Sequence, residues 1–291
     1  MALVDAIHRF TFEELAIRGA LVQLQGVLKQ TSEHAQYPAD VQSLLGQALC
    51  ASALMSSTIK YDGSLTLQVQ GQGALRLLLA QSTNQYGLRG MARFDDPLPA
   101  DASFAQLTGQ GRTLINIQAN KQARPWQGVI DTNYPSVAAM IQAYFVQSEQ
   151  LDTQLTLFAN ETACFGLLLQ KLPDENSDDA DGWDRLTQLA QTLTEDEALS
   201  LPAAEIINRL FHEETVRIYE PKPASFSCNN CGERVEAMLR QVDRAELDQL
   251  VADTGKVEVT CEFCAKTFSY DAVDLAKVCD PTTVSASSRV Q

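Results

Sequence analysis

The segments Cys228-Asn-Asn-Cys231 and Cys261-Glu-Phe-Cys264 decide how the end of this 291-residue chain folds. Each segment holds two sulfur atoms across a two-residue spacer, and 29 residues separate the segments. Two such pairs can complete a tetrahedral Cys₄ zinc site with zinc–sulfur bonds of about 2.3 Å. The free energy needed to close a loop grows only slowly with its length, so the long spacer is tolerable. We therefore expect one zinc ion bound by Cys228, Cys231, Cys261 and Cys264.

Two other kinds of protein also use such cysteine pairs. A thioredoxin-type pair lies at a strand-to-helix turn in a βαβ unit, and neither pair here has those flanks. A nucleic-acid zinc ribbon requires a basic surface, whereas residues 228–291 carry 7 basic and 11 acidic groups. Spacing alone favours a purely structural zinc site. Cys279 lies 15 residues beyond Cys264, so we expect a spare thiol there rather than a ligand.

The region around the cysteines has few large apolar side chains. It holds about sixty residues, a length at which a hydrophobic core is barely sufficient by itself. Asp243 followed by Glu246 predicts a capped helix through Val251. Residues 256–260 and 267–270 resemble short strands on either side of the second cysteine pair. Metal binding is expected to supply the stability that this core lacks.

Charge divides the chain into three parts. Lys and Arg number 22 against 37 Asp and Glu, a net charge of −15 that repels phosphate backbones and argues against a nucleic acid partner. The acidic excess is 3 over residues 1–170, 8 over residues 171–227 and 4 over residues 228–291. A polar acidic stretch begins after Pro173. We therefore predict an N-terminal domain (1–172), an acidic linker (173–227) and a C-terminal domain (228–291).

The apolar stretches are too short to span a membrane. Residues 74–80 are interrupted by Arg76, and a bilayer requires about 20 apolar residues. Asp5 stands where a signal peptide would carry positive charge. Seven cysteines in a chain without an export signal favour metal or redox chemistry over a disulfide scaffold. We expect a cytoplasmic protein with no membrane partner.

Residues 1–172 have the pattern of an α+β fold. Apolar residues at helical spacing predict a helix from Val41 to Met55. Residues 64–70 alternate with period two and, after the turn at residues 71–73, residues 74–80 return as a second strand. A helix follows Pro135. Five further segments have the strand pattern: residues 88–94, 112–117, 127–130, 153–158 and 164–170. We expect all of them to form one antiparallel sheet with the hairpin, which the last two segments close.

The linker contains two short amphipathic helices. One runs from Trp183 to Leu193, and the other from Ile206 to Phe211 with Pro202 in its first turn. Helices this short are marginal in isolation, so their apolar stripes require a docking partner. The acidic residues between positions 174 and 184 are expected to be a solvated connection rather than a cation site.

Motifs of catalysis are missing from the sequence, so we expect no catalytic residue and no enzyme. Gly71-x-Gly73 and Gly109-x-Gly111 lack the third glycine of a dinucleotide-binding loop and are expected to join strand to strand. The sequence contains neither GxSxG nor HExxH. His212 is expected to be a capping or surface residue, and Cys164 a small core residue.

Nearly the whole chain resembles the redox-regulated 33 kDa chaperonins, which are ATP-independent holdases. The similar segments, besides the terminal cysteines, are Arg18-Gly19, Asp62-Gly63, Gln70–Gly73, Arg89-Gly90, Gln127–Val129, Tyr144–Gln150 and Leu210–Glu214. The family commonly has CxC as its first pair, where this chain has Cys228-x-x-Cys231. It also tends to have paired glycines where this chain has Phe165-Gly166.

The resemblance implies a client-binding and dimerising N-terminal core, a helical linker and a C-terminal redox switch. The reduced form would hold one zinc ion per chain and be inactive. On this basis we hypothesise that Cys261–Cys264, reacting first, and Cys228–Cys231 form disulfides. Zinc would then leave, switch and linker would unfold, and the exposed apolar surface of an oxidised homodimer would bind unfolding proteins.

Two other functions remain open from the residues alone. One is a zinc-stapled adaptor that binds a folded partner and does not respond to oxidants. The other is a thiol–disulfide oxidoreductase, which would turn over a disulfide substrate.

Overall fold

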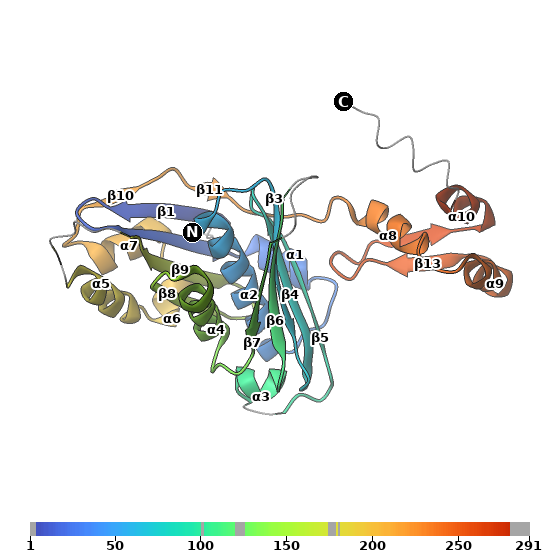
Figure 1. Cartoon of the computed structure of the whole chain (residues 1–291), viewed down its shortest axis with the longest axis horizontal. Helices are drawn as coiled ribbons and strands as arrows, with labels where there is room; N and C mark the ends of the chain where they lie inside the picture. Colours follow the sequence, from blue (N-terminus) through green and yellow to red (C-terminus); the bar gives the residue numbers. More distant parts are fainter. Residues whose placement is uncertain (1–3, 100–101, 120–125, 174–178, 180, 280–291) are drawn as a thin grey trace. The chain divides into compact units, whose positions relative to one another are not determined.

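The computed structural model describes residues 4–99, 102–119, 126–173, 179 and 181–279. It divides into two compact units, Met1–Ser227 and Cys228–Gln291, whose elements are labelled in Figure 1. Within the described residues, the first unit has two six-stranded sheets with helices, and the second has a two-stranded sheet with short helices. The predicted α+β class is confirmed. No helix of the described part is long and apolar enough to cross a membrane.

The first sheet brings together strands from both ends of the N-terminal unit. Its antiparallel order is β10-β1-β2-β9-β8, and β11 also pairs with β1. The expectation that residues 153–158 and 164–170 close the sheet of the central hairpins is wrong. Alternation shows which face of a strand is buried but not which strand lies beside it. The strands are β1 (Ala6–Phe12), β2 (Ile17–Leu24), β8 (Thr153–Ala159), β9 (Cys164–Lys171), β10 (Val216–Ile218) and β11 (Lys222–Pro223).

The second sheet contains the predicted hairpin of the central region, and its order is β12-β5-β4-β3-β6-β7. Gly71 and Gly73 lie in the turn between β3 and β4, as expected. Gly109-x-Gly111 instead joins the short helix α3 (Phe104–Thr108) to β6, so its expected strand-to-strand position is wrong. The strands are β3 (Gly63–Gln70), β4 (Leu75–Thr83), β5 (Gly87–Phe94), β6 (Arg112–Ala119), β7 (Trp126–Asp131) and β12 (Ser225–Phe226).

Helix α2 (Ala39–Thr58) lies between the two sheets and forms the centre of the main core (Figure 1). It includes the predicted helix and extends it at both ends. The other helices of this core are α1 (Gly26–Ser32) and α4 (Val137–Tyr144), which continues as the π-helical turn η1 (Phe145–Glu149). The Asp5 carboxylate accepts hydrogen bonds of 2.6–3.1 Å from the backbone N–H groups of Gln25, Gly26 and Val27. It thereby caps the amino end of α1.

Three linker helices cover the face of the first sheet opposite α2: α5 (Gly182–Gln191), α6 (Glu195–Ser200) and α7 (Ala203–Phe211). Helix α6 was not predicted, and Pro202 is the N-cap of α7 rather than part of its first turn. The ring of Phe211 lies 5.2 Å from that of Phe12 and 6.0 Å from that of Phe10. The docking partner that these helices require is therefore the N-terminal sheet.

Close packing on this face depends on Gly19 of β2. A Cβ atom on Gly19 would lie 2.1 Å from Cζ of Phe10, whose ring covers that glycine. Phe165 of β9 is fully buried on the same face. We call Phe10, Phe12, Phe165 and Phe211 the aromatic seam, since together they join the linker helices to the sheet.

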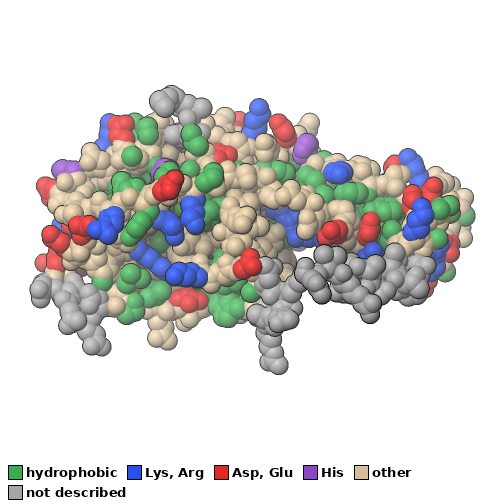
Figure 2. All heavy atoms as spheres, turned by 90° about the horizontal axis from the view of Figure 1, so that it is seen from above, with side chains coloured by type: hydrophobic (Ala, Val, Ile, Leu, Met, Phe, Trp, Pro, Cys, Tyr) green, Lys and Arg blue, Asp and Glu red, His purple; other side chains and the backbone are tan. Residues whose placement is uncertain are grey.

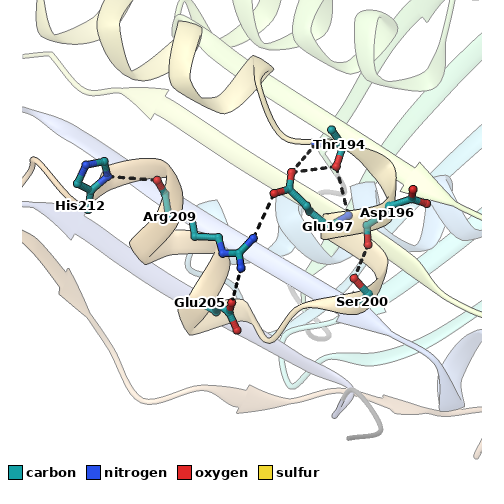
Figure 3. Close-up of polar contacts among 7 residues, drawn as sticks. All are labelled: Thr194, Asp196, Glu197, Ser200, Glu205, Arg209 and His212. Atoms are coloured by element: carbon teal, nitrogen blue, oxygen red, sulfur yellow. Dashed lines mark hydrogen bonds and ion pairs between the residues drawn. The ribbon is translucent and has the colours of Figure 1, made fainter.

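The linker helices make polar contacts on both sides. On the inner side, Nε2 of Gln23 in β2 donates to the carbonyl oxygens of Ala198 and Leu201 at 3.1 and 2.8 Å. Figure 3 shows the contacts centred on Arg209. Oε1 of Glu205 lies 2.8 Å, and Oε1 of Glu197 3.3 Å, from the guanidinium of Arg209. These side chains are 39–52% exposed, and ion pairs of that kind contribute little to stability. Nδ1 of His212 lies 3.3 Å from the carbonyl oxygen of Arg209, so His212 is a surface residue at the end of α7. Buried apolar side chains, among them the aromatic seam, together with the Gln23 hydrogen bonds therefore attach the linker.

The C-terminal unit has the predicted central helix and both predicted strands. Asp243 is the N-cap of α9, and its carboxylate accepts a 2.8 Å hydrogen bond from the N–H of Ala245. Helices α8 and α10 were not predicted. The elements are α8 (Cys231–Leu239), α9 (Arg244–Thr254), β13 (Val257–Thr260), β14 (Thr267–Tyr270) and α10 (Ala272–Cys279).

Replacing Phe211 with alanine should loosen the linker helices. The substitution removes a fully buried ring from the aromatic seam, so we expect the free energy of unfolding to fall by about 3–5 kcal/mol. Urea unfolding, followed by the fluorescence of Trp183 in a Trp126→Phe background, measures this loss. Ile218→Ala, at a position 44% exposed, is the matched control and should change stability by less than about 0.5 kcal/mol. Equal losses in the two variants would contradict the assigned role of the seam.

Candidate metal centre

The four predicted ligands come from two tight turns of the C-terminal unit. Cys231 is the first residue of α8, and Cys228 precedes it by three positions. Cys261 and Cys264 lie in the connection between β13 and β14. There the N–H of Ala265 donates to the carbonyl oxygen of Cys261 at 2.8 Å, and Ala265 has a φ of 50°. The chain therefore reverses direction within a few residues, which brings the two sulfurs of this turn together.

All four sulfur atoms lie within 4.8 Å of one another. Sγ of Cys228 is 3.7 Å from Sγ of Cys261, and Sγ of Cys231 is 3.8 Å from Sγ of Cys264. In a tetrahedron with metal–sulfur bonds of about 2.3 Å, neighbouring sulfurs are about 3.8 Å apart. Cys231 and Cys261 are buried, and Cys228 and Cys264 are half-buried. The sequence prediction had named these four residues, and the fold brings all of them to one point.

This donor set fits a zinc ion. Four thiolates are the most common ligands of structural zinc, and the spacing of the sulfurs needs little adjustment to accept one ion. Within the part of the chain that the structure describes, it is the one group of three or more histidine, cysteine or carboxylate side chains close enough to share an ion. The acidic stretch after Pro173 falls mostly on residues 174–178 and 180, outside the described ranges; Asp179 pairs with Arg185 at 2.8 Å.

The thiols differ in acidity. Burial raises the pKa of Cys261, but hydrogen bonds from the backbone N–H groups of Phe263 and Cys264 and contacts with neighbouring sulfurs outweigh it, so that its pKa lies below the usual range. Burial dominates at Cys264 and raises the pKa of that thiol. Cys261 is accordingly the more readily deprotonated member of the second pair.

The apolar core of the C-terminal unit is small. Its buried apolar core comprises Val235, Leu239, Leu247, Val257, Tyr270, Leu275 and Val278. The side chains of Leu250 and Val273 are 43% and 60% exposed, although each belongs to a helix. So small a core leaves a domain of this size marginally stable, and a metal bound by four thiolates adds folding free energy directly.

The remaining cysteines lie elsewhere in the fold. Cys50 on α2 and Cys164 at the start of β9 are fully buried in the main core, and burial raises the pKa of Cys50 well above its usual range. Cys279 ends α10 and packs beside the small core. None of the three belongs to the cluster of four sulfurs.

Comparisons with known proteins agree on one family over nearly the whole chain. A family model described as "Hsp33 protein" matches residues 5–271. A "33 kDa chaperonin" of Nitrosococcus oceani is 43% identical over 94% of this chain and 94% of its own length. One of Shewanella woodyi is 39% identical over 94% and 95%. The crystal structure of a 33 kDa chaperonin from Thermotoga maritima matches 97% of this chain and 99% of its own, with a TM-score of 0.82 at 19% identity.

Substituting serine for Cys261 should abolish tight metal binding. A serine hydroxyl is a poor zinc ligand, and the apparent binding free energy of about 10–16 kcal/mol for a structural site depends on all four thiolates. We expect one zinc per reduced wild-type chain and much less than one in Cys261→Ser, as measured by elemental analysis after dialysis. Cys279→Ser, which removes a cysteine outside the cluster, should keep a full equivalent. Full zinc content in Cys261→Ser would contradict the four-sulfur site.

Proposed function

This chain belongs to the Hsp33 family, and from that membership we propose that it is a redox-regulated holdase chaperone that works without ATP. Its reduced form is quiescent, and oxidation of the four clustered cysteines converts it to a form that binds unfolding proteins. One observation carries the proposal. The same chain has a cluster of four thiols in a unit with a small core, and amphipathic helices that cover the aromatic seam.

In the reduced form the apolar surfaces are covered. A zinc ion, when bound, would keep Cys228, Cys231, Cys261 and Cys264 as thiolates and stabilise the C-terminal unit. The linker helices bury the aromatic seam. Figure 2 shows hydrophobic side chains interspersed with charged and polar ones on the face drawn. A client with exposed apolar segments therefore finds no large patch to bind there.

Oxidation acts on the sulfurs themselves. A thiolate attacks one oxygen of hydrogen peroxide, the O–O bond breaks, and a sulfenic acid forms with release of hydroxide. A neighbouring thiol then attacks that sulfur, forms the disulfide and displaces the oxygen as water. Two peroxides oxidise four thiols, and the resulting disulfides are Cys261–Cys264, formed first, and Cys228–Cys231. Disulfide sulfurs are poor zinc ligands, so the C-terminal unit loses the ion and unfolds.

Release of the linker then needs a second stress. The linker helices pack on the N-terminal sheet, so unfolding of the C-terminal unit leaves the aromatic seam in place. Between α7 and Cys228 the regular structure is limited to β10, β11 and β12, strands of two or three residues whose pairing is weak. An exposed Arg217–Glu13 ion pair and the buried Ala224 add to it. Mild heat melts such short elements. The apolar stripes of the linker helices and the phenylalanines of the aromatic seam then bind clients. The net charge of −8 on residues 171–227 keeps the complexes soluble.

Further parts of the proposal come from the resemblance to the family and from the charge of the chain. The oxidised protein is a homodimer, and its partners are unfolding or misfolding proteins in the cytoplasm rather than nucleic acids or membranes. It turns over no substrate and has no catalytic residue. An adaptor that binds one folded partner equally well in reductant, or an oxidoreductase that turns over a disulfide, would behave differently in the test below.

Peroxide at mildly elevated temperature should release one zinc per chain and switch on suppression of client aggregation. Zinc release is followed by the absorbance of a zinc chelate. Client aggregation is followed in the same sample by the light scattering of a thermally unfolding protein. Peroxide at low temperature should release zinc with little suppression, because the linker is still docked. Cys279→Ser is the matched control and should behave as wild type. Zinc release without suppression in the heated sample would contradict the holdase function.

The same oxidised sample reports which cysteines have paired. Trypsin, which cleaves after Lys and Arg except before Pro, yields residues 218–234 with the first pair and residues 257–266 with the second. The proposed pairing gives these two peptides separately under non-reducing conditions, each lighter by two hydrogens. Pairing of Cys228 with Cys261, whose sulfurs are 3.7 Å apart, would instead link them into one species and contradict the proposed disulfides.

A further inference from the structure

A cavity of about 250 Å³ lies in the N-terminal unit, far from the cysteine cluster in sequence. Its walls come from β1, β2 and β9, from the carboxyl end of α2, and from Tyr219, which follows β10. Phe10 covers Gly19 on the linker side of this sheet. Because side chains alternate along a strand, Arg9 and Arg18 point to the opposite face. Both arginines line the cavity.

The two guanidinium groups lack anionic partners. Nε of Arg9 is buried and has no hydrogen-bond acceptor. Nε and a terminal nitrogen of Arg18 both donate to one neutral atom, Oε1 of Gln170, at 3.0 and 2.5 Å. Among the ion pairs of the described residues, none involves either arginine. Burial without a counter-charge is costly, and it lowers the pKa of Arg18. An anion in the cavity would relieve that cost.

The other polar groups of the cavity do not oppose an anion. Hydroxyl oxygens of Thr11 and Tyr219 are 3.2 Å apart, so one of their two protons is free to point into the cavity. At the end of α2, the hydroxyls of Ser57 and Thr58 donate to the carbonyl oxygens of residues 54 and 55 at 2.6 and 2.8 Å. The second of these bonds satisfies the carbonyl of residue 55, one of the last four of α2, and so reduces the negative partial charge at the helix end.

A second cavity, of about 210 Å³, adjoins the first, since Arg18 and Thr58 line both. Its other walls are mainly apolar and include Met55, Ile115 and Phe145. The acid on its wall, Glu149, is exposed and accepts a 3.0 Å hydrogen bond from the hydroxyl of Tyr144. A molecule that reached both cavities would place an anionic group beside the two arginines and an apolar part beyond Arg18.

We propose that these joined cavities bind a small amphiphilic oxyanion, with a carboxylate or phosphate head between Arg9 and Arg18 and a short apolar tail in the second cavity. The charge-assisted, bidentate geometry of guanidinium groups suits both kinds of head. The site goes beyond the holdase function, and it lies on the face of the sheet opposite the linker helices. Its occupation does not require oxidation.

Calorimetric titration of the reduced, zinc-loaded, full-length protein tests the site. The probes are octanoate, octyl phosphate, inorganic phosphate and octanol. We expect saturable one-to-one binding of octanoate, octyl phosphate or both, and the tighter of the two identifies the head. Inorganic phosphate and octanol should each bind at least about tenfold more weakly, because each lacks half of the recognised chemistry.

Variants locate the binding. Arg9→Met and Arg18→Met keep the length of the side chain but remove its charge, and each should weaken octanoate binding roughly 10- to 100-fold. Arg217→Met is the matched control, because it removes one charge from β10 of the same sheet at a residue outside both cavities. It should bind as wild type. If an arginine variant misfolds, Ser57→Phe, at the half-buried end of α2, fills the cavity without altering either arginine and should also abolish binding.

Three results would overturn the proposal. One is the absence of saturable binding for both octanoate and octyl phosphate. Another is equal binding of octanol, which would mean that the charges play no part. The third is unchanged binding in folded Arg9→Met, Arg18→Met and Ser57→Phe proteins, which would place the ligand elsewhere. The binding test measures neither zinc content nor client protection. If the proposed holdase function proved wrong, the result for the cavities would therefore still hold.

Discussion

The meeting of four sulfur atoms at one point is the constraint on which the C-terminal unit depends. Its buried core is made of few residues, several of its helical apolar side chains are exposed, and its strands are four residues long. Such a unit has a small core, and under the proposed function the chemical state of the cysteines decides whether it stays folded. A chemical signal at sulfur can thereby become a change in folding.

The two faces of the first sheet have different tasks. One face packs against α2 and belongs to the large, permanent core, while the other carries the aromatic seam and is covered by short helices. The covering helices are short and the ion pairs of Arg209 are exposed, so under the proposed function these helices are the part that detaches. Their proposed release would uncover an apolar face on a sheet that stays folded. Phe165 adds a large, fully buried ring to this seam.

Sequence reasoning located the metal centre well but placed the sheets less well. Cys228, Cys231, Cys261 and Cys264 could be found because ligand spacing is a local property with a strict chemical meaning. Hairpins such as β3–β4 were also local. The placement of β9 beside β2 was not, because pairing between distant strands leaves no local mark. The β1–β2 hairpin is local but was not predicted. The paired arginines of the cavity lie nine positions apart on two strands, and only the register of β1 against β2 brings them to one face.

Hydrogen–deuterium exchange of the full-length protein, read peptide by peptide in the reduced zinc form and in the peroxide-treated form, tests the central claim most directly. The account predicts that residues 231–279 lose nearly all protection on oxidation, while β2 and β9 keep theirs at the same temperature. Retained protection of α8, β13 and β14 after all four sulfurs have been oxidised would contradict it.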